Sequence, residues 1–261
     1  MNRVRHPLKF RLLRVARVEA LSPALVRVTL TGDLSDFVSA SFDDHVKVFF
    51  PANGEEKPVL PNFGPDGMVF PEGVERPAAR DYTPRRFDAQ ANELDIEFAL
   101  HEAGPATAWA AQAQPGQYLG VGGPRGSMVI PTGFDWHLLV GDETALPAIQ
   151  RRLTELPPGA RVAVVVEVAD RAARIALPTE ADLYAIWCYR EESESAQLLV
   201  DAVSEVWLPP GEGYVWAAGE ASAIRAVRTH LCNERSVDKR RIRASAYRRR
   251  GAQAADETIE D

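Results

Sequence analysis

The chain has 261 residues, which is enough for one large domain or two domains of ordinary size. Hydrophobic residues make up 46% and charged residues 26% of it, a globular balance that argues against extensive disorder. The formal net charge of −7 argues against a protein that binds duplex DNA, because phosphate contacts need a positive surface.

The cysteines and the opening residues indicate the compartment. Cys188 and Cys232 form no CxxC pattern, so we expect neither a disulfide framework nor a metal site, and a reducing environment suits them. The opening MNRVRHPLKF has basic residues but no apolar segment after them, so we expect no signal peptide. The apolar run 162–169 is too short to span a bilayer. We therefore expect a cytoplasmic protein. We also expect a monomer that binds neither nucleic acid nor a membrane.

The first half of the chain has the pattern of β-structure. Residues 11–20, 24–32, 45–50 and 94–101 are short segments that alternate in polarity or are rich in Val and Phe, with turn residues between them. This pattern is typical of a barrel or a sandwich. The segment 51–79 has six prolines and four glycines without an apolar period, which predicts a long loop that is functional or mobile.

The pattern changes near residues 131–136. Beyond them, apolar runs of five to eight residues alternate with segments of helical period, as in a parallel α/β sheet. We therefore expect two domains, an antiparallel β-barrel over residues 1–132 and a parallel α/β domain over residues 133–261.

Residues 80–85, RDYTPR, place three useful side chains on one short extended segment. Alternation puts Arg80 and Tyr82 on one face and Thr83 on the other. An arginine fork suits a phosphate, a tyrosine ring offers a stacking face, and a threonine hydroxyl can hydrogen-bond a ring nitrogen. Taken alone, the pattern is also typical of an ordinary exposed strand.

A second motif follows about twenty residues later. Residues 104–107, Gly-Pro-Ala-Thr, open the helical stretch 107–114. Pro105 leaves no unsatisfied N–H in the first turn, and Thr107 can cap the helix or contact an anion at its start. The two motifs together predict a diphosphate site; the alternative is a plain barrel strand followed by a capped helix.

The order RxYT, then GxxT before a helix, resembles the FAD-binding signature of ferredoxin-reductase-like flavoenzymes. Seven segments in order resemble one branch, the siderophore-interacting family: DDHVKVFFP (43–51), RDYTPRRFD (80–88), LHEAGPATAWA (100–110), GGPRGS (122–127), GDETALPAI (141–149), WAAGEASAIRAVR (216–228) and RIRASAYRRRG (242–251). The resemblance implies a flavin-binding β-barrel followed by a nicotinamide-binding α/β domain. It implies flavin contacts at Arg80, Tyr82, Thr83, Leu100, His101, Gly104, Ala106, Thr107 and Trp109.

The segment GDETALPAI also has physical meaning of its own. It follows an apolar strand and begins a helix near Thr144, and ligands collect at the carboxyl ends of parallel strands. A complete GxGxxG fingerprint is absent, and a helix start with a threonine cap is the plain alternative. The resemblance implies nicotinamide contacts here and after the strand that ends near residue 218; they are Asp142, Glu143, Thr144, Ala145, Gly219 and Glu220.

The substrate expected from the resemblance is an iron(III)–siderophore complex. The five histidines have no metal-ligand spacing, so we expect no protein metal site and an iron ion that arrives already chelated. Such complexes are often anionic, so we expect cations around them. The resemblance points to Lys47 and Arg125, and the basic run 239–250 adds Arg248, Arg249 and Arg250. The family's usual ending has a tryptophan after the tyrosine, where this chain has Arg248.

The resemblance therefore implies an FAD-dependent ferric-siderophore reductase that uses NADPH or NADH. Arg171, Arg174 and Arg190 follow neighbouring strands and could bind a 2′-phosphate, whereas Asp170 could hold a ribose hydroxyl of NADH. The alternatives are a general flavin or ferric reductase without siderophore preference and a siderophore-binding protein that is not an enzyme.

Overall fold

The computed structural model describes residues 2–64, 67–100, 104–193, 195, 197–248 and 257–258. The chain divides into two compact units, Met1–Ile130 and Pro131–Asp261. The boundary expected from the sequence, after residue 132, lies two residues further along the chain. Each unit is described by itself.

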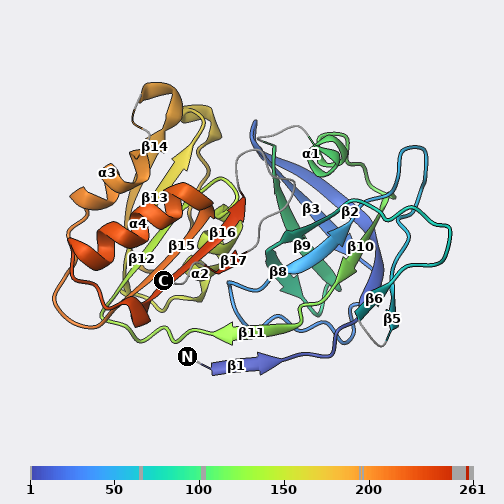
Figure 1. Ribbon diagram of the computed structural model, residues 1–261, viewed down its shortest axis with the longest axis horizontal. Helices are drawn as coiled ribbons and strands as arrows, with labels where there is room; N and C mark the ends of the chain where they lie inside the picture. The colour runs from blue at the N-terminus through green and yellow to red at the C-terminus, as the bar shows by residue number, and fades with distance from the viewer. Residues whose placement is uncertain are drawn as a thin grey trace. The chain divides into compact units, whose positions relative to one another are not determined.

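The first unit is built on one antiparallel sheet of seven strands (Figure 1). Its order is β7-β4-β10-β2-β3-β9-β8. The strands are β2 (Phe10–Ser22), β3 (Leu25–Thr31), β4 (Val46–Phe49), β7 (Ala79–Tyr82), β8 (Pro84–Asp88), β9 (Glu93–Ala99) and β10 (Tyr118–Gly122). The two edge strands, β7 and β8, are separated in the chain by Thr83 alone, so the sheet is curled.

The interior of the curled sheet is filled by every second side chain of its strands. Leu13 and Val15 of β2, and Val46 and Val48 of β4, are at most 1% exposed. This alternation is the signal that the sequence carries for β-structure, because successive side chains of a strand point to opposite faces. The antiparallel barrel predicted for the first half of the chain is confirmed as a curled half-barrel.

Smaller elements surround this sheet. They are β1 (Asn2–Arg5), which pairs with β11 (Gly126–Val129), the hairpin β5 (Asn62–Gly64) and β6 (Gly67–Val69), and the six-residue helix α1 (Pro105–Ala110). The hairpin lies in the segment 51–79, which was predicted as a loop. Phe63 stacks on Phe10 with ring centroids 4.8 Å apart, so this segment packs against the sheet.

The second unit is a parallel sheet with helices on both faces. Its order is β14-β13-β12-β15-β16-β17, and only the last pair is antiparallel. The strands are β12 (Trp136–Asp142), β13 (Arg161–Val168), β14 (Asp182–Tyr189), β15 (Gly213–Glu220), β16 (Ile242–Arg248) and β17 (Glu257–Thr258). The parallel α/β fold and the strand predicted within RIRASAY are both confirmed.

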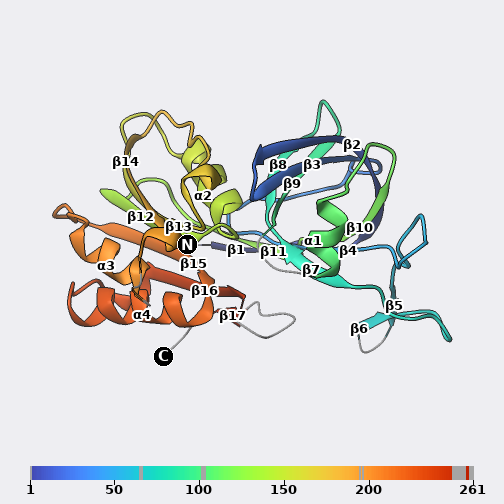
Figure 2. The ribbon, with the colours of Figure 1, turned by 90° about the horizontal axis from the view of Figure 1, so that it is seen from above.

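Among the residues that the structure describes, three α-helices and three short 3₁₀ turns complete this unit. Helix α2 (Leu146–Glu155) covers one face of the sheet, and α3 (Leu198–Glu205) and α4 (Ala221–Asn233) cover the other (Figure 2). The 3₁₀ turns are η1 (Arg171–Ala173), η2 (Arg190–Glu192) and η3 (Lys239–Arg241). In the described part of the chain, no helix has the length and apolar character needed to cross a membrane.

Candidate functional site

The RDYT motif lies on the edge strand β7 and continues into Thr83 at the seam of the half-barrel. Arg80 and Tyr82 are paired with Val48 and Val46 of β4, so they share a face, as the alternation predicts. Both side chains are partly exposed, whereas Thr83 is 6% exposed.

Four of the predicted flavin residues meet in one cluster beside the barrel core: Tyr82, Leu100, Ala106 and Trp109 all pack against it. The ring centroids of Tyr82 and Phe98 are 4.6 Å apart, and those of Phe98 and Trp109 are 5.9 Å apart. Burial raises the pKa of the Tyr82 phenol well above its ordinary value, so this group stays neutral. The cluster joins β7, β9 and α1 although their residues are far apart in the chain.

Several polar groups of the motif have no side-chain partner among the described residues, and this tests whether the site suits FAD. Arg80 donates to the carbonyl oxygen of Ala79 and forms no ion pair with a described residue. The hydroxyls of Tyr82 and Thr83 form no hydrogen bond with any described residue. The Tyr82 and Thr83 hydroxyls and the Arg80 guanidinium can therefore donate hydrogen bonds to a ligand. These groups fit a diphosphate and a flavin ring.

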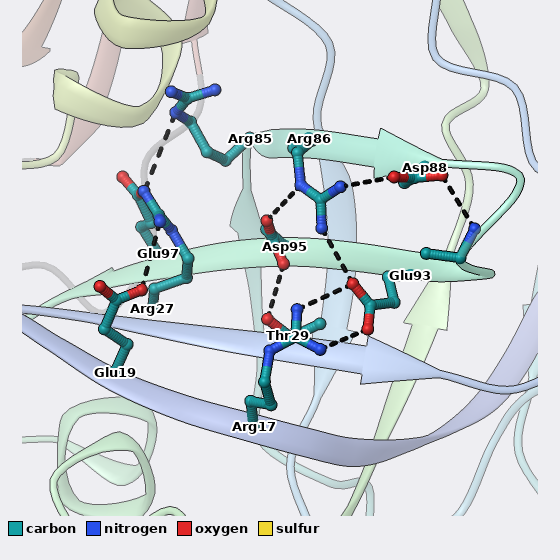
Figure 3. Close-up of polar contacts among 11 residues, drawn as sticks. Arg17, Glu19, Arg27, Thr29, Arg85, Arg86, Asp88, Glu93, Asp95 and Glu97 are labelled. Carbon is teal, nitrogen blue, oxygen red and sulfur yellow. Dashed lines mark hydrogen bonds and ion pairs between the residues drawn. The ribbon is translucent and has the colours of Figure 1, made fainter. Parts of the chain in front are cut away.

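Arg85 and Arg86, which follow the motif, both form ion pairs with carboxylates of β9 (Figure 3). Arg86 Nε lies 2.7 Å from Asp95, and Arg85 Nε lies 3.8 Å from Glu97. Burial raises the pKa of Glu97, an effect that the neighbouring Arg27 opposes. These pairs fix β8 against β9 and thereby fix the residue that precedes β8, Thr83.

The second flavin motif forms the start of helix α1, although not with the cap that we expected. Gly104 is the N-cap residue and no side chain caps the helix. Thr107 lies inside the helix and does not cap it, so the first of its two predicted roles is wrong. The second, contact with an anion, stays a prediction; its hydroxyl forms no hydrogen bond with a described residue. His101, the remaining predicted flavin residue, lies outside the described residues.

Lys47 was predicted to be a substrate cation, and in this fold it already has an anionic neighbour. Its Nζ lies 2.8 Å from both carboxylate oxygens of Asp81, the residue directly opposite on β7. Directly opposed residues share a face, so Lys47 and Asp81 project from the face opposite to that of Arg80 and Tyr82.

Arg125 lies on a tightly held turn after β10 and is exposed. Buried Arg11 donates to the carbonyl oxygen of Gly123 at 3.2 Å, and the carbonyl oxygen of Arg125 accepts from the amide of His6. The Arg125 guanidinium forms no ion pair with a described residue. The turn therefore presents an unpaired cation on a fixed backbone.

In the second unit, Asp142 connects three strand ends. One of its oxygens accepts from the amide and the hydroxyl of Thr144, and the other accepts from the amide of Glu220 at 3.0 Å and from Arg248 Nε at 3.0 Å. A Cβ on Gly219 would lie 2.9 Å from the Asp142 carboxyl, so glycine is needed there. Thr144 does not cap α2, whose N-cap residue is Ala145.

The other two acidic residues predicted to contact the nicotinamide are also engaged within this unit. Glu143 is 2% exposed, accepts from the amide of Ala169 and forms an ion pair with Arg190. Glu220 caps α4 by accepting from the amides at residues 222 and 223. These carboxylates therefore build the edge of the sheet, and the backbone around them is what a nucleotide could contact.

The arginines considered for a 2′-phosphate differ in their surroundings. Arg190 pairs with Glu143 and Glu167, and exposed Arg171 pairs with Glu192. Arg174 lies 5.5 Å from the centre of the Trp187 ring and forms no ion pair with a described residue.

Asp170, the alternative for NADH, instead caps the 3₁₀ turn η1 by accepting from the amide of Ala173.

A cavity of about 240 Å³ lies at the same edge and was not predicted. It is lined by Glu167, by residues 197–200 of the start of α3, and by Ser222, Ala223 and Ala226 of α4. Burial raises the pKa of Glu167, an effect that Arg190 opposes. A single acidic residue near the carboxyl end of the otherwise apolar run 162–169 is the sequence signal that could have indicated this position.

Among the described residues, no group of three or more His, Cys, Asp or Glu side chains could hold a metal ion.

Comparison with known protein families shows which family this chain belongs to. Residues 14–128 match the model of the siderophore-interacting FAD-binding domain, and residues 134–251 match the model of the siderophore-interacting protein. An NADPH-dependent ferric-chelate reductase of Escherichia coli is 39% identical over 94% of this chain and 95% of its own. The chain belongs to the siderophore-interacting protein family.

Further known proteins and solved structures are similar to this chain. The ferric vibriobactin reductase of Vibrio cholerae is 36% identical, over 92% of this chain and 90% of its own. The crystal structure of a siderophore utilization protein from T. fusca has a TM-score of 0.87 at 39% identity and covers 99% of each chain. A ferredoxin reductase of carbazole 1,9a-dioxygenase has a TM-score of 0.63 at 19% identity and covers 91% of this chain and 68% of its own, which shows a common fold alone.

Proposed function

We propose that this protein is an FAD-dependent oxidoreductase that passes electrons from a nicotinamide cofactor to the iron(III) of a ferric siderophore. The observation that carries the proposal concerns the RDYT motif, at the seam of a half-barrel whose chain continues into a parallel α/β unit. Among the described residues, the Arg80 guanidinium has no carboxylate partner and the Tyr82 and Thr83 hydroxyls have no hydrogen-bond partner. The family models of both units and the two reductases among the relatives support it.

Three groups of the first unit would hold the flavin. Arg80 and the uncapped start of α1 at residues 104–107 would bind the diphosphate, and Tyr82 and Thr83 would contact the ring. Leu100, Ala106 and Trp109 would pack around it, and His101 completes the proposed set. Bound FAD would supply the chemistry, which is to take up a hydride and give up electrons one at a time. The protein would orient the ring and keep water from it.

The ferric siderophore would be the substrate rather than a ligand of protein side chains. Lys47 and Arg125 of the first unit and Arg248 of the second are the proposed cations that attract it; Arg249 and Arg250, proposed with them, lie outside the described residues. Hard oxygen ligands bind iron(II) far less strongly than iron(III), so reduction would release the metal. No acid–base pair is needed for this reaction.

The proposed electron donor binds at the carboxyl edge of the parallel sheet. The backbone at residues 142–145 and 219–220 would contact the nicotinamide, and the nearby cavity lies at the same edge. We propose NADPH as the preferred donor. The E. coli relative is named NADPH-dependent, and Arg174 is an arginine near this edge without a described carboxylate partner. A cytoplasmic location, a monomeric state and the absence of nucleic-acid or membrane binding stay predictions of the sequence.

The absorption spectrum of the purified protein tests the proposal and separates it from its alternatives. A yellow protein that NADPH bleaches, and that a ferric siderophore reoxidises better than simple ferric salts do, is the proposed reductase. Equal reoxidation by every ferric complex identifies a general ferric reductase. A colourless protein that still binds the chelate is a carrier. Arg80→Ala should lower flavin affinity about ten- to a hundredfold through one lost charge-assisted contact, whereas Arg17→Ala, which removes an exposed arginine of β2, should not.

A further inference from the structure

One proposed substrate cation is held by an anion of the flavin motif itself. The Lys47 ammonium lies 2.8 Å from each oxygen of Asp81. The two side chains are 34% and 26% exposed, so solvent and ligands can reach the pair. Because the residues are directly opposed in the β4–β7 ladder, the backbone itself brings the two charges together.

The second proposed cation of this unit, Arg125, lies on the neighbouring strand connection and has no ion-pair partner in the described part of the chain. Lys47 is also opposed to Gly122, the last residue of β10. The turn to Arg125 begins there, and a methyl group built on Gly123 would lie 3.9 Å from the carbonyl oxygen of His45. Arg125 is exposed and forms no ion pair with a described residue. The region therefore combines one neutralised and one unneutralised cation.

The paired Lys47 should attract an anionic substrate less strongly than the exposed Arg125 does. An anion that approaches Lys47 is attracted by the ammonium and repelled by the carboxylate in contact with it, so the two effects largely cancel beyond a few ångströms. The long-range attraction of the region then comes from Arg125, whereas the Lys47–Asp81 pair offers a donor and an acceptor at close range. Such a surface suits a ligand with polar groups and little net charge better than a polyanion.

We infer that Asp81 is a specificity-determining residue which lowers the affinity for strongly anionic ferric chelates and thereby favours chelates of low net charge. The iron(III) complex of three hydroxamates is neutral, and the complex of three catecholates carries three negative charges, so the two classes are the natural comparison. This inference rests on the proposed function, in that Lys47 must lie where the chelate binds. It names the substrate class as the neutral hydroxamate type.

Gallium(III) complexes test the inference without electron transfer, because gallium(III) has the charge and size of iron(III) and is not reduced under these conditions. Equilibrium dialysis would measure the Kd of a neutral gallium tris-hydroxamate and a trianionic gallium tris-catecholate for the flavin-loaded protein. Asp81→Asn keeps an acceptor oxygen for Lys47 and removes the charge. Asp33→Asn is the matched control, because Asp33 also accepts a lysine Nζ at 2.8 Å and the substitution changes the net charge equally.

We expect Asp81→Asn to bind the trianion about three- to tenfold more tightly and the neutral complex within about twofold of wild type, with the gain lost at high salt. Lys47→Gln should weaken trianion binding, and the double variant should return close to wild type. Equal effects of Asp81→Asn on the two complexes, an equal gain in Asp33→Asn, or weaker trianion binding would overturn the inference. A wild-type protein that binds neither complex and reduces no ferric chelate would instead contradict the proposed function.

Discussion

Arg248 Nε lies 3.0 Å from Asp142 Oδ2 and links the end of β16 to the end of β12. The sequence analysis predicted that Arg248 binds the siderophore and that Asp142 contacts the nicotinamide. Asp142 is 2% exposed and also accepts hydrogen bonds from Thr144 and Glu220. A carboxylate this deeply buried depends on its donors, because removing one cationic partner leaves part of its desolvation uncompensated.

Arg248→Trp introduces the residue that the family usually has after the tyrosine, and here it should destabilise the protein. Loss of the contact with the buried Asp142 carboxylate should lower the free energy of unfolding by about 1–3 kcal/mol. Urea unfolding followed by circular dichroism measures this. Arg240→Trp is the control, since Arg240 pairs with Asp238 at the surface and is 85% exposed. Unchanged stability in Arg248→Trp would show that the Asp142 contact is dispensable.

Thr83→Val should separate flavin binding from folding. The Thr83 hydroxyl has no described protein partner, so its removal should leave the stability of the flavin-free protein within about 0.5 kcal/mol of wild type. The same substitution should slow reduction of the bound flavin by the nicotinamide about tenfold, because one hydrogen bond to the ring is lost. Thr29→Val, which breaks a 2.7 Å bond to Asp95, should show the reverse pattern. A destabilised flavin-free Thr83→Val protein would argue for a structural role.

The preference for NADPH over NADH should depend on Arg174, because Arg190 is already paired with Glu143 and Glu167. Arg174→Ala should raise KM for NADPH about tenfold and leave KM for NADH unchanged, because one charged contact to the 2′-phosphate is lost. Arg171→Ala, whose arginine already pairs with Glu192, is the control and should have a smaller effect. Steady-state kinetics with both donors would decide; equal effects on NADPH and NADH would show that Arg174 does not read the 2′-phosphate.

Stability should fall at mildly acidic pH because of His137. Burial, and secondarily the charge of Arg152, lower its pKa to about 4. The folded protein therefore holds His137 neutral while the unfolded chain protonates it below its ordinary pKa near 6.5. The contribution to stability is complete above that value, is lost progressively as the pH falls towards 4, and amounts to at most about 3 kcal/mol.

His137→Gln should make the unfolding free energy less dependent on pH between about 4 and 6.5. Urea unfolding at several pH values in that window measures the slope for the variant and the wild type. Identical slopes would show that His137 does not titrate on unfolding.

The fold could be predicted because its signals are local. Alternation in β2 and β4 marks strands with one buried face, and the apolar runs of β12, β13 and β15 mark strands buried on both faces. The motif around Arg80 could be found for the same reason, since its residues are consecutive. The hairpin in 51–79 was missed because β5 and β6 are three residues each.

The partners of the site residues could not be predicted, because they depend on register and on strand order. Lys47 meets Asp81 only when β4 and β7 pair in one particular register. Arg248 meets Asp142 only because β15 and β16 follow β12 in the sheet. Charge type alone therefore suggested ligand contacts where the fold had formed internal pairs.

The yield of iron(II) per nicotinamide oxidised tests the central claim most directly. The flavin-loaded protein would be mixed anaerobically with limiting NADPH, excess ferric tris-hydroxamate siderophore and an iron(II)-trapping dye. Because a hydride carries two electrons and each iron(III) takes one, the account predicts two trapped iron(II) ions for each NADPH consumed, and none in protein freed of FAD. NADPH oxidation without trapped iron(II), or an equal yield from the flavin-free protein, would contradict the assignment as a flavin-dependent ferric-siderophore reductase.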